Sequence, residues 1–169
     1  MKTRSLWGKT TPEVLARWRV PLGFLSAIFA YWFARSTWRS ITIGLTIAAA
    51  GELVRIWASG HLDKAREITR SGPYRYVSHP LYFGSCIMGV GFAIAANALI
   101  PALIVGAYFV LTIPAAMITE TRAISNLQAG VERPFSVARV MANREYRAIA
   151  GFILGAGLLI LRMELRSAL

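Results

Sequence analysis

The chain has 169 residues, of which 56% are hydrophobic, and a formal net charge of +11. This apolar fraction exceeds that of ordinary soluble domains and indicates a membrane protein. The positive charge does not indicate nucleic-acid binding, because the Lys and Arg residues lie between apolar segments and form no long run. The single cysteine, Cys86, excludes an internal disulfide framework and a CxxC metal site, and its apolar surroundings favour a buried thiol over a reactive one.

Five apolar segments follow one another along the chain. They cover residues 20–34, 41–58, 81–96, 101–119 and 148–161. Because the backbone groups of a membrane-spanning segment must be satisfied inside the protein, and no strand-like alternation is visible, the sequence predicts helices. We therefore expect an all-α integral membrane protein with about five transmembrane helices. The last segment is the shortest, so its length does not decide whether it spans the whole membrane. The basic first 20 residues lack the apolar stretch and cleavage site of a signal peptide.

The connections predict how the segments are arranged. Only the short "NALI" separates the third segment from Pro101, so the third and fourth helices are expected to form an antiparallel hairpin. Most of the 19 Lys and Arg residues precede the first segment or lie in the second-to-third and fourth-to-fifth connections. The positive-inside rule places these parts in the cytoplasm. The opposite side keeps four cations, which are Arg35, Arg39, Arg162 and Arg166.

An ionisable pair lies near the cytoplasmic end of the second segment, in "GELVRIWAS". Arg55 follows Glu52 by three residues, which places the two on neighbouring faces of one helix turn. Charged groups at membrane depth are expensive, so the pair is either a functional site or a mutually neutralising structural device. Arg55 could also extend its side chain toward the interface.

The stretch "SGPYRYVSHPLYFG" precedes the third segment. Gly72 permits a positive φ and Pro73 fixes its own φ, so "SGPY" predicts a turn. Pro80 suits the first position of a helix, which leaves His79 between rigid neighbours at the mouth of a polar pocket. The alternative is a helix-capping His79 beside an interfacial belt of tyrosines, namely Tyr74, Tyr76 and Tyr82.

Further polar residues are expected on the same side. Glu120 and Thr121 directly follow the fourth segment, so the hairpin brings them close to His79. A carboxylate there could bind an amine or a ribose hydroxyl, or it could be an ordinary helix-end residue. Asn143 and Tyr146, three residues apart in "NREYRA", lie before the fifth segment and give a weak signal alone.

Residues 51–121, and above all "GPYRYVSHPLYFG", resemble the isoprenylcysteine carboxyl methyltransferase family and its bacterial relatives, which also resemble phospholipid N-methyltransferases. The resemblance implies a cytosolic pocket for S-adenosylmethionine and a lipidic substrate that arrives from within the bilayer. It implies a pocket lined by Tyr76, Val77, His79, Pro80 and Tyr82, with Glu120 contacting the cofactor from the other side. It also implies that Arg55, Asn143 and Tyr146 border the acceptor or close the site.

The chain departs from the family pattern at three places. Ser78 stands where the family usually has Arg before the His-Pro pair, and Thr121 stands where a second acidic residue is common. The paired-tyrosine segment that usually follows is replaced by "RAISNLQAGVERPFSVARVMA". This replaced segment concerns acceptor recognition more than cofactor binding.

The sequence thus predicts one membrane methyltransferase domain over residues 1–169. Its parts are a cofactor-binding core at 51–121, a cytosolic connection at 122–147 and a last membrane helix at 148–162. We expect an S-adenosylmethionine-dependent enzyme of a bacterial inner membrane, with Arg55 and Glu120 as catalytic residues, that methylates a lipidic or apolar small molecule, favouring a carboxyl group. Its partners are this substrate and membrane lipids, with neither nucleic acid nor metal. The alternatives are a sterol-reductase-like enzyme, whose loop typically reads "PNY" where this chain has "HPLY", and a non-catalytic scaffold whose basic loops bind headgroups.

Overall fold

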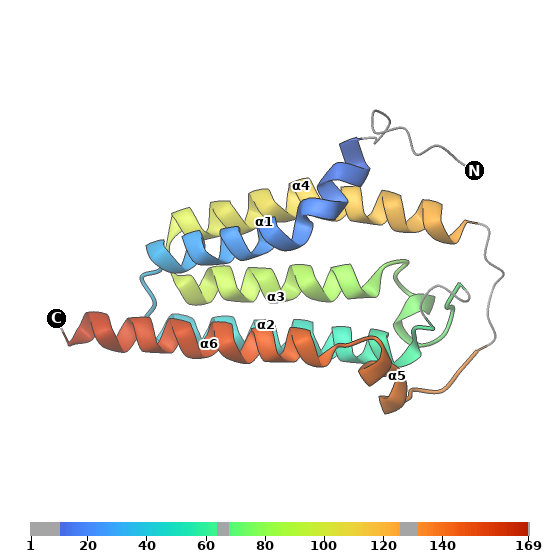
Figure 1. Ribbon diagram of the computed structural model, residues 1–169. Coiled ribbons are helices and arrows are strands. Elements are labelled where there is room, and N and C mark those ends of the chain that lie inside the picture. Colours follow the sequence, from blue (N-terminus) through green and yellow to red (C-terminus); the bar gives the residue numbers. More distant parts are fainter. Residues whose placement is uncertain (1–10, 64–67, 126–131, 169) are drawn as a thin grey trace.

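The computed structural model describes residues 11–63, 68–125 and 132–168. All secondary-structure elements in these ranges are helices, as the sequence predicts for an all-α protein (Figure 1). The elements are α1 (Thr11–Phe33), α2 (Trp38–His61), the 3-10 turn η1 (Gly72–Arg75), α3 (Pro80–Ala96), α4 (Leu99–Ile124), α5 (Val137–Ala142) and α6 (Tyr146–Ser167). Each of the five predicted segments lies in one of the five long helices. Five cations that were assigned to the cytoplasmic side lie outside the described residues, namely Lys2, Arg4, Lys9, Lys64 and Arg66.

Local sequence sets where several helices begin and end. Thr37 and Ser40 form a capping box at the start of α2, in which each side chain accepts a hydrogen bond from the backbone of the other. Asn97, with φ of 50°, ends α3 in the left-handed conformation that Asn tolerates, and α4 starts two residues later. Pro21 lies inside α1, which bends along its length (Figure 1).

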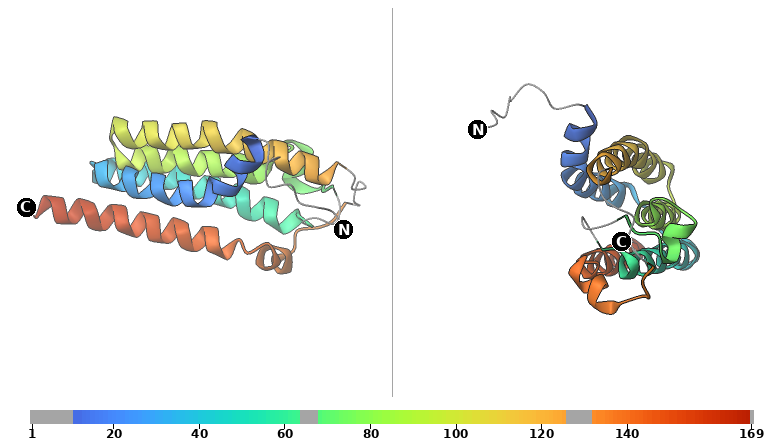
Figure 2. Two further views of the ribbon diagram at one scale, coloured as in Figure 1. Left: turned by 45° about the horizontal axis from the view of Figure 1, so that its top comes forward. Right: turned by 90° about the vertical axis from the view of Figure 1, so that its right-hand side faces the viewer.

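The helices lie side by side in the order α1, α4, α3, α2, α6 (Figure 2). The α3–α4 hairpin is present as predicted. The start of α1 and the α2–α3 and α4–α6 connections, with η1 and α5, lie at one end of the bundle (Figure 1). The α1–α2 and α3–α4 turns and the end of α6 lie at the other. The chain topology therefore gathers the two longest connections at one end.

The most extensive helix contact joins α2 and α3, and small residues make it possible. A methyl group on Gly91 would lie 2.5 Å from the carbonyl oxygen of Gly44, and one on Gly51 would lie 2.5 Å from the backbone nitrogen of Met88. Close approach of backbones at small residues is a common way to associate helices in lipid. The two helices therefore hold each other in a fixed register.

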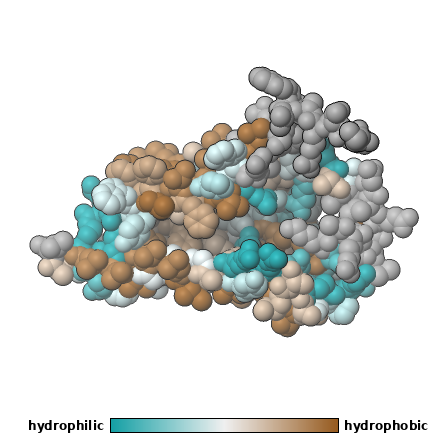
Figure 3. Space-filling model, viewed as in Figure 1, coloured by the Kyte–Doolittle hydropathy of each residue, from teal (hydrophilic) through white to brown (hydrophobic). Residues whose placement is uncertain are grey.

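Within the described ranges, three helices are long and apolar enough to cross a membrane, namely α2, α4 and α6, while α3 is apolar but shorter. The fifth segment is longer than the sequence predicted, because α6 starts at Tyr146 and continues to Ser167; its 22 residues span about 33 Å. Large hydrophobic side chains face outward along the bundle, among them Phe24, Val110 and Leu154. Hydrophilic residues gather toward its ends (Figure 3). The chain is an integral membrane protein by these features.

Candidate functional site

The loop between α2 and α3 fixes the position of His79. Gly72 adopts a φ of 59°, and its backbone lies so close to the His61 ring that a side chain would overlap it. Pro73 is buried in η1, and His79 is the N-cap of α3 with Pro80 at the first helical position. The two prolines and Gly72 therefore hold the loop in one conformation, and this conformation places the His79 ring at the start of α3.

The His79 ring faces the end of α4. Its Nδ1 lies 3.9 Å from Oε2 of Glu120, and its Nε2 lies 3.4 Å from Oγ1 of Thr121. The His79 side chain is 15% exposed and that of Glu120 is 37% exposed. The hairpin thus brings together two titratable groups that lie far apart in sequence. Thr121, at the position of a second acidic residue in the resembled family, offers the ring a hydroxyl instead.

Tyr82 extends this group of residues, which we call the His79 cluster (His79, Tyr82, Glu120 and Thr121). Its ring centroid lies 5.8 Å from that of His79, and its hydroxyl accepts a 3.1 Å hydrogen bond from Nη1 of Arg19 in α1. The hydroxyl also interacts with the Glu120 carboxylate. The cluster therefore joins α1, α3 and α4 at one end of the bundle.

The remaining loop residues that the sequence assigned to the cofactor differ in accessibility. Tyr76 is 80% exposed, Val77 is half-buried and Pro80 is fully buried. Pro80 therefore supports the start of α3, whereas the Tyr76 ring is available to a ligand from solution.

A second group of polar residues surrounds Arg55, and we call it the Arg55 cluster (Glu52, Arg55, Ser85 and Glu145). Nη2 of Arg55 lies 2.7 Å from Oε1 of Glu145, and Nε lies 3.5 Å from Oε2 of Glu52. Its Nη1 donates to Oγ of Ser85 and, at 3.4 Å, to the carbonyl oxygen of Leu81. The side chains of Glu52 and Glu145 are 6% and 5% exposed. One guanidinium thus balances two buried carboxylates from α2 and from the start of α6.

Tyr74 in η1 lies between the two clusters. Burial raises the pKa of its hydroxyl well above the usual range, and the carboxylates of Glu120 and Glu145 raise it further. The Tyr74 hydroxyl therefore keeps its proton to a higher pH than an ordinary tyrosine does.

Asn143 lies on the segment that approaches α6. Its side-chain amide donates to the carbonyl oxygens of Ser59 at 3.0 Å and Leu62 at 2.9 Å, at the C-terminal end of α2. The backbone N–H of Ser136 and Nε of Arg139 donate to the carbonyl oxygen of Gly60, at 3.1 and 2.8 Å. These bonds satisfy the carbonyls that the last turn of a helix leaves free. The segment 132–143 therefore caps α2.

Tyr146 begins α6 and is 44% exposed, with the guanidinium of Arg147 lying 6.0 Å from the centroid of its ring. Of the three residues expected to border the acceptor, Arg55 is enclosed by carboxylates, Asn143 caps α2, and Tyr146 faces outward. The structure therefore brings Arg55 close to Glu145 rather than to Asn143 or Tyr146.

Sequence reasoning missed Glu145. Two features of the sequence could have indicated it. Glu145 is an acidic residue in "NREYRA" at the start of an apolar helix, and Arg55 is a cation at membrane depth that has only Glu52 as a partner on its own helix. Nothing in the spacing indicates which distant acidic residue reaches Arg55, because α3, α4 and α5 lie between α2 and Glu145 in the chain.

The His79 cluster and the neighbouring Tyr76 fit the cofactor that the sequence resemblance implies. S-adenosylmethionine carries an ammonium group, a carboxylate, a ribose diol and an adenine ring. The partly exposed Glu120 can accept hydrogen bonds from the ammonium or the ribose, and the exposed ring of Tyr76 can stack on adenine. In the described ranges, no group of three or more His, Cys, Asp or Glu residues is arranged to hold a metal ion.

Comparison with known proteins identifies the family. A family model described as phospholipid methyltransferase matches residues 18–127, a span that runs from α1 through α4 and includes the His79 cluster. No curated protein and no solved structure gives a significant match. The matched part covers well over half of the chain, and the helical membrane architecture agrees with it. The chain belongs to the phospholipid methyltransferase family.

Proposed function

We propose that the protein is an S-adenosylmethionine-dependent methyltransferase that methylates a lipidic or apolar small molecule, with a carboxyl group favoured as acceptor. The observation that carries the proposal is the 3.9 Å approach of His79 Nδ1 to Glu120 Oε2, within the part of the chain that matches the methyltransferase family. This approach gathers the predicted cofactor residues at one end of an apolar bundle.

The cofactor is held by the loop before α3 and by the end of α4. We assign the contacts with it to Tyr76, Val77, His79, Tyr82 and Glu120, while the buried Pro80 supports this site by starting α3. When bound, S-adenosylmethionine supplies a methyl group that its sulfonium has already activated. Glu120 and Tyr76 bind its polar and aromatic parts, and His79 orients Glu120. Tyr82, which Arg19 contacts at 3.1 Å, keeps α1 against this site.

The chain contributes mainly by positioning the two reactants. Alignment of donor and acceptor can lower a barrier by about 7 to 11 kcal/mol. A carboxylate acceptor is already deprotonated at neutral pH and needs no general base, so His79 and Glu120 serve in binding rather than in proton transfer. Arg55 borders the acceptor, and Glu145 and Glu52 fix the direction of its guanidinium.

The acceptor arrives from the bilayer. The outward-facing hydrophobic side chains place the bundle in lipid, and the face in Figure 3 is hollowed between α1 and α6. The distribution of Lys and Arg supports a cytoplasmic position for the His79 cluster and an inner-membrane location. Membrane lipids are thus both the surroundings of the protein and the source of its substrate.

Calorimetric titration of the detergent-purified protein with S-adenosylhomocysteine tests this function. We expect saturable binding, and a nicotinamide dinucleotide, the cofactor expected of a reductase, should not bind. Glu120→Gln should weaken the affinity about tenfold or more, because it removes a charge-assisted contact worth about 1.5 to 3 kcal/mol. His79→Ala should also weaken the affinity, because Glu120 then loses the ring that orients it. Glu164→Gln, an exposed residue of α6 at the other end of the bundle, is the matched control and should bind normally.

Circular dichroism establishes that each variant is folded. Absence of binding by the folded wild-type protein would contradict the enzyme assignment and favour the scaffold. Unchanged affinity in both His79→Ala and Glu120→Gln would instead move the cofactor site away from the His79 cluster.

A further inference from the structure

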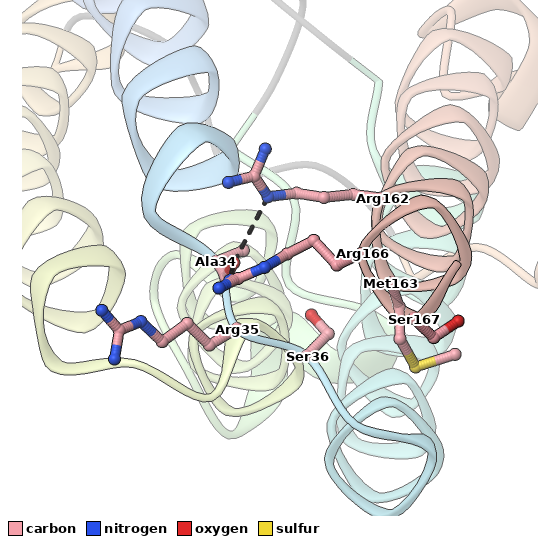
Figure 4. Close-up of a pocket in the computed structure, with 7 residues that line it drawn as sticks. All are labelled: Ala34, Arg35, Ser36, Arg162, Met163, Arg166 and Ser167. Atoms are coloured by element: carbon pink, nitrogen blue, oxygen red, sulfur yellow. Dashed lines mark hydrogen bonds between the residues drawn. The ribbon is translucent and has the colours of Figure 1, made fainter. Parts of the chain in front are cut away.

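A cavity lies at the end of the bundle opposite to the His79 cluster, between the C-terminal end of α1 and the last turns of α6 (Figure 4). Its volume is about 330 Å³, whereas one water molecule takes about 30 Å³ in the liquid. The cavity can therefore hold a polar headgroup and not only solvent. It is lined by Ala34, Arg35, Ser36, Arg162, Met163, Arg166 and Ser167.

Three of the lining residues are arginines. None of the three forms an ion pair with a carboxylate of the described residues, in contrast to Arg55, which contacts two. The sequence places only four cations on this side of the membrane, and these three arginines are among them. The positive-inside rule expects few Lys and Arg residues on this side. Uncompensated positive charge is thus concentrated at one cavity.

Arg162 and Arg166 are held in place by the end of α1. Nε of Arg162 and Nη1 of Arg166 each donate to the carbonyl oxygen of Ala34 at 3.3 Å, and Nη2 of Arg162 donates to that of Trp32. The guanidinium of Arg162 also lies 5.1 Å from the centroid of the Tyr31 ring. These contacts leave Nη1 of Arg162 and both Nε and Nη2 of Arg166 without a partner in the described part of the chain. The two side chains are therefore oriented, yet each keeps donors for a ligand.

Ser36 gives an independent indication. Its Oγ is buried and has no hydrogen-bond partner among the described residues, which is uncommon for a buried hydroxyl. In Figure 4 this oxygen points into the space beside Arg166. The two guanidiniums offer only donors and positive charge, and the Ser36 hydroxyl can add one further donor, so the space suits a ligand with acceptors and negative charge.

We infer that this cavity binds the phosphate group of an anionic lipid headgroup. Arginine forks match the geometry of phosphate oxygens, and the hydroxyl of Ser36 supplies a further donor. The neighbouring surface is apolar, since Trp32, Leu161 and Leu165 are each more than half exposed, so acyl chains of the same lipid can lie against α1 and α6. A lipid molecule thus fills the gap that separates these two helices. The inference does not depend on the proposed function.

Protection of the detergent-purified protein against thermal unfolding tests the inference. The probes are a short-chain phosphatidylglycerol, a diacylglycerol of the same chain length without phosphate, and inorganic phosphate. Phosphatidylglycerol should stabilise the wild-type protein saturably and the diacylglycerol should not. The affinity should fall about tenfold or more in the double variant Arg162→Gln/Arg166→Gln. Arg39→Gln, an exposed arginine at the same end outside the cavity, should bind like the wild type.

A second variant guards against loss of structure, because Arg162 and Arg166 also hold α1. Ser36→Asp retains both arginines and their bonds to Ala34 but places a carboxylate where the phosphate would bind, so it should abolish the response to phosphatidylglycerol. Circular dichroism should show that all these variants keep their helices.

Three results would overturn the inference. Equal stabilisation of the protein by the diacylglycerol would show that the lipid binds through its acyl chains only, without a phosphate site. An equal loss of affinity in Arg39→Gln and in the double variant would show diffuse attraction to a positive surface. Stabilisation by inorganic phosphate as strong as that by phosphatidylglycerol would assign the site to a soluble anion instead of a lipid.

Discussion

Helices α3 and α6 both pack against α2, but in different ways. Along α3 the backbones approach each other at Gly44, Gly51, Gly84 and Gly91, so contact is close over most of the length. α6 is largely exposed, with a single buried residue, Leu159, and at mid-length its Phe152 ring packs edge-on against that of Phe92 in α3, with 5.8 Å between the centroids. Glu145 joins its start to Arg55, and Arg162 joins its last turns to the end of α1.

The difference separates a rigid part of the molecule from an adjustable one. The α2–α3 pair positions both Arg55 and the start of α3, where His79 lies, and small residues fix its register. α6 has fewer packing contacts to lose if it shifts, chiefly that between Phe152 and Phe92, because lipid replaces protein along most of its surface. If the proposed function holds, an acceptor that enters beside α6 would disturb the proposed cofactor residues least.

The largest effect is expected when the attachment of α6 is broken at Arg55. Arg55→Met leaves Glu52 and Glu145 buried without a counter-charge and should lower the free energy of unfolding by about 3 to 5 kcal/mol. Denaturant titration in detergent, followed by circular dichroism, measures this. Glu145→Gln in the same chain should recover part of the loss, since it removes one stranded charge. A decrease below about 1 kcal/mol would mean that the pair does not hold α6.

The next effect tests the rigid contact directly. Gly91→Val forces a branched side chain against the backbone of α2 and should lower the free energy of unfolding by about 1 to 3 kcal/mol or more. Gly157→Val is the matched control, because no atom lies within 4 Å of a side chain added at Gly157. Thermal unfolding of the two variants in the same detergent compares them. Equal melting temperatures would show that α2 and α3 are no more tightly packed than α6.

The smallest effect concerns the segment that leads into α6. Asn143→Ala removes two hydrogen bonds to the end of α2, each worth about 1 kcal/mol, and should lower stability by about 1 to 2 kcal/mol without changing the affinity for S-adenosylhomocysteine. Asn143→Asp keeps the shape but places a carboxylate against two carbonyl oxygens at the C-terminal end of α2, so it should lower stability further. If methyl transfer to an acceptor falls while stability is unchanged, Asn143 contacts the acceptor instead.

Much of the architecture could be predicted from sequence. The apolar segments gave five helices because every spanning segment must satisfy its own backbone, and the short turn around Asn97 required a hairpin. The approach of His79 to Glu120 follows from that hairpin. The family was also identifiable, because "GPYRYVSHPLYFG" is a contiguous and specific stretch whose turn and helix start depend on local residues such as Gly72 and Pro80.

Contacts between distant segments could not be predicted in the same way. The segment 132–143 has no apolar periodicity that would indicate its position against the end of α2, and α5 within it is only six residues long. The glycines of α2 and α3 are unremarkable in a sequence, since small residues are common in membrane helices and only the partner helix gives them a role. Asn143 is another example: its sequence position suggests a site near α6, whereas its amide caps α2.

The placement of Glu52 one helical turn before Arg55 has a consequence for biosynthesis. Helix α2 emerges from the ribosome long before Glu145, and at about 5 to 20 residues per second several seconds pass in between. During that interval Glu52, on the same helix, can neutralise the charge of Arg55 as α2 enters the bilayer. α2 and α3 can therefore assemble early, and the attachment of α6 to Arg55 is among the last contacts that the nascent chain completes.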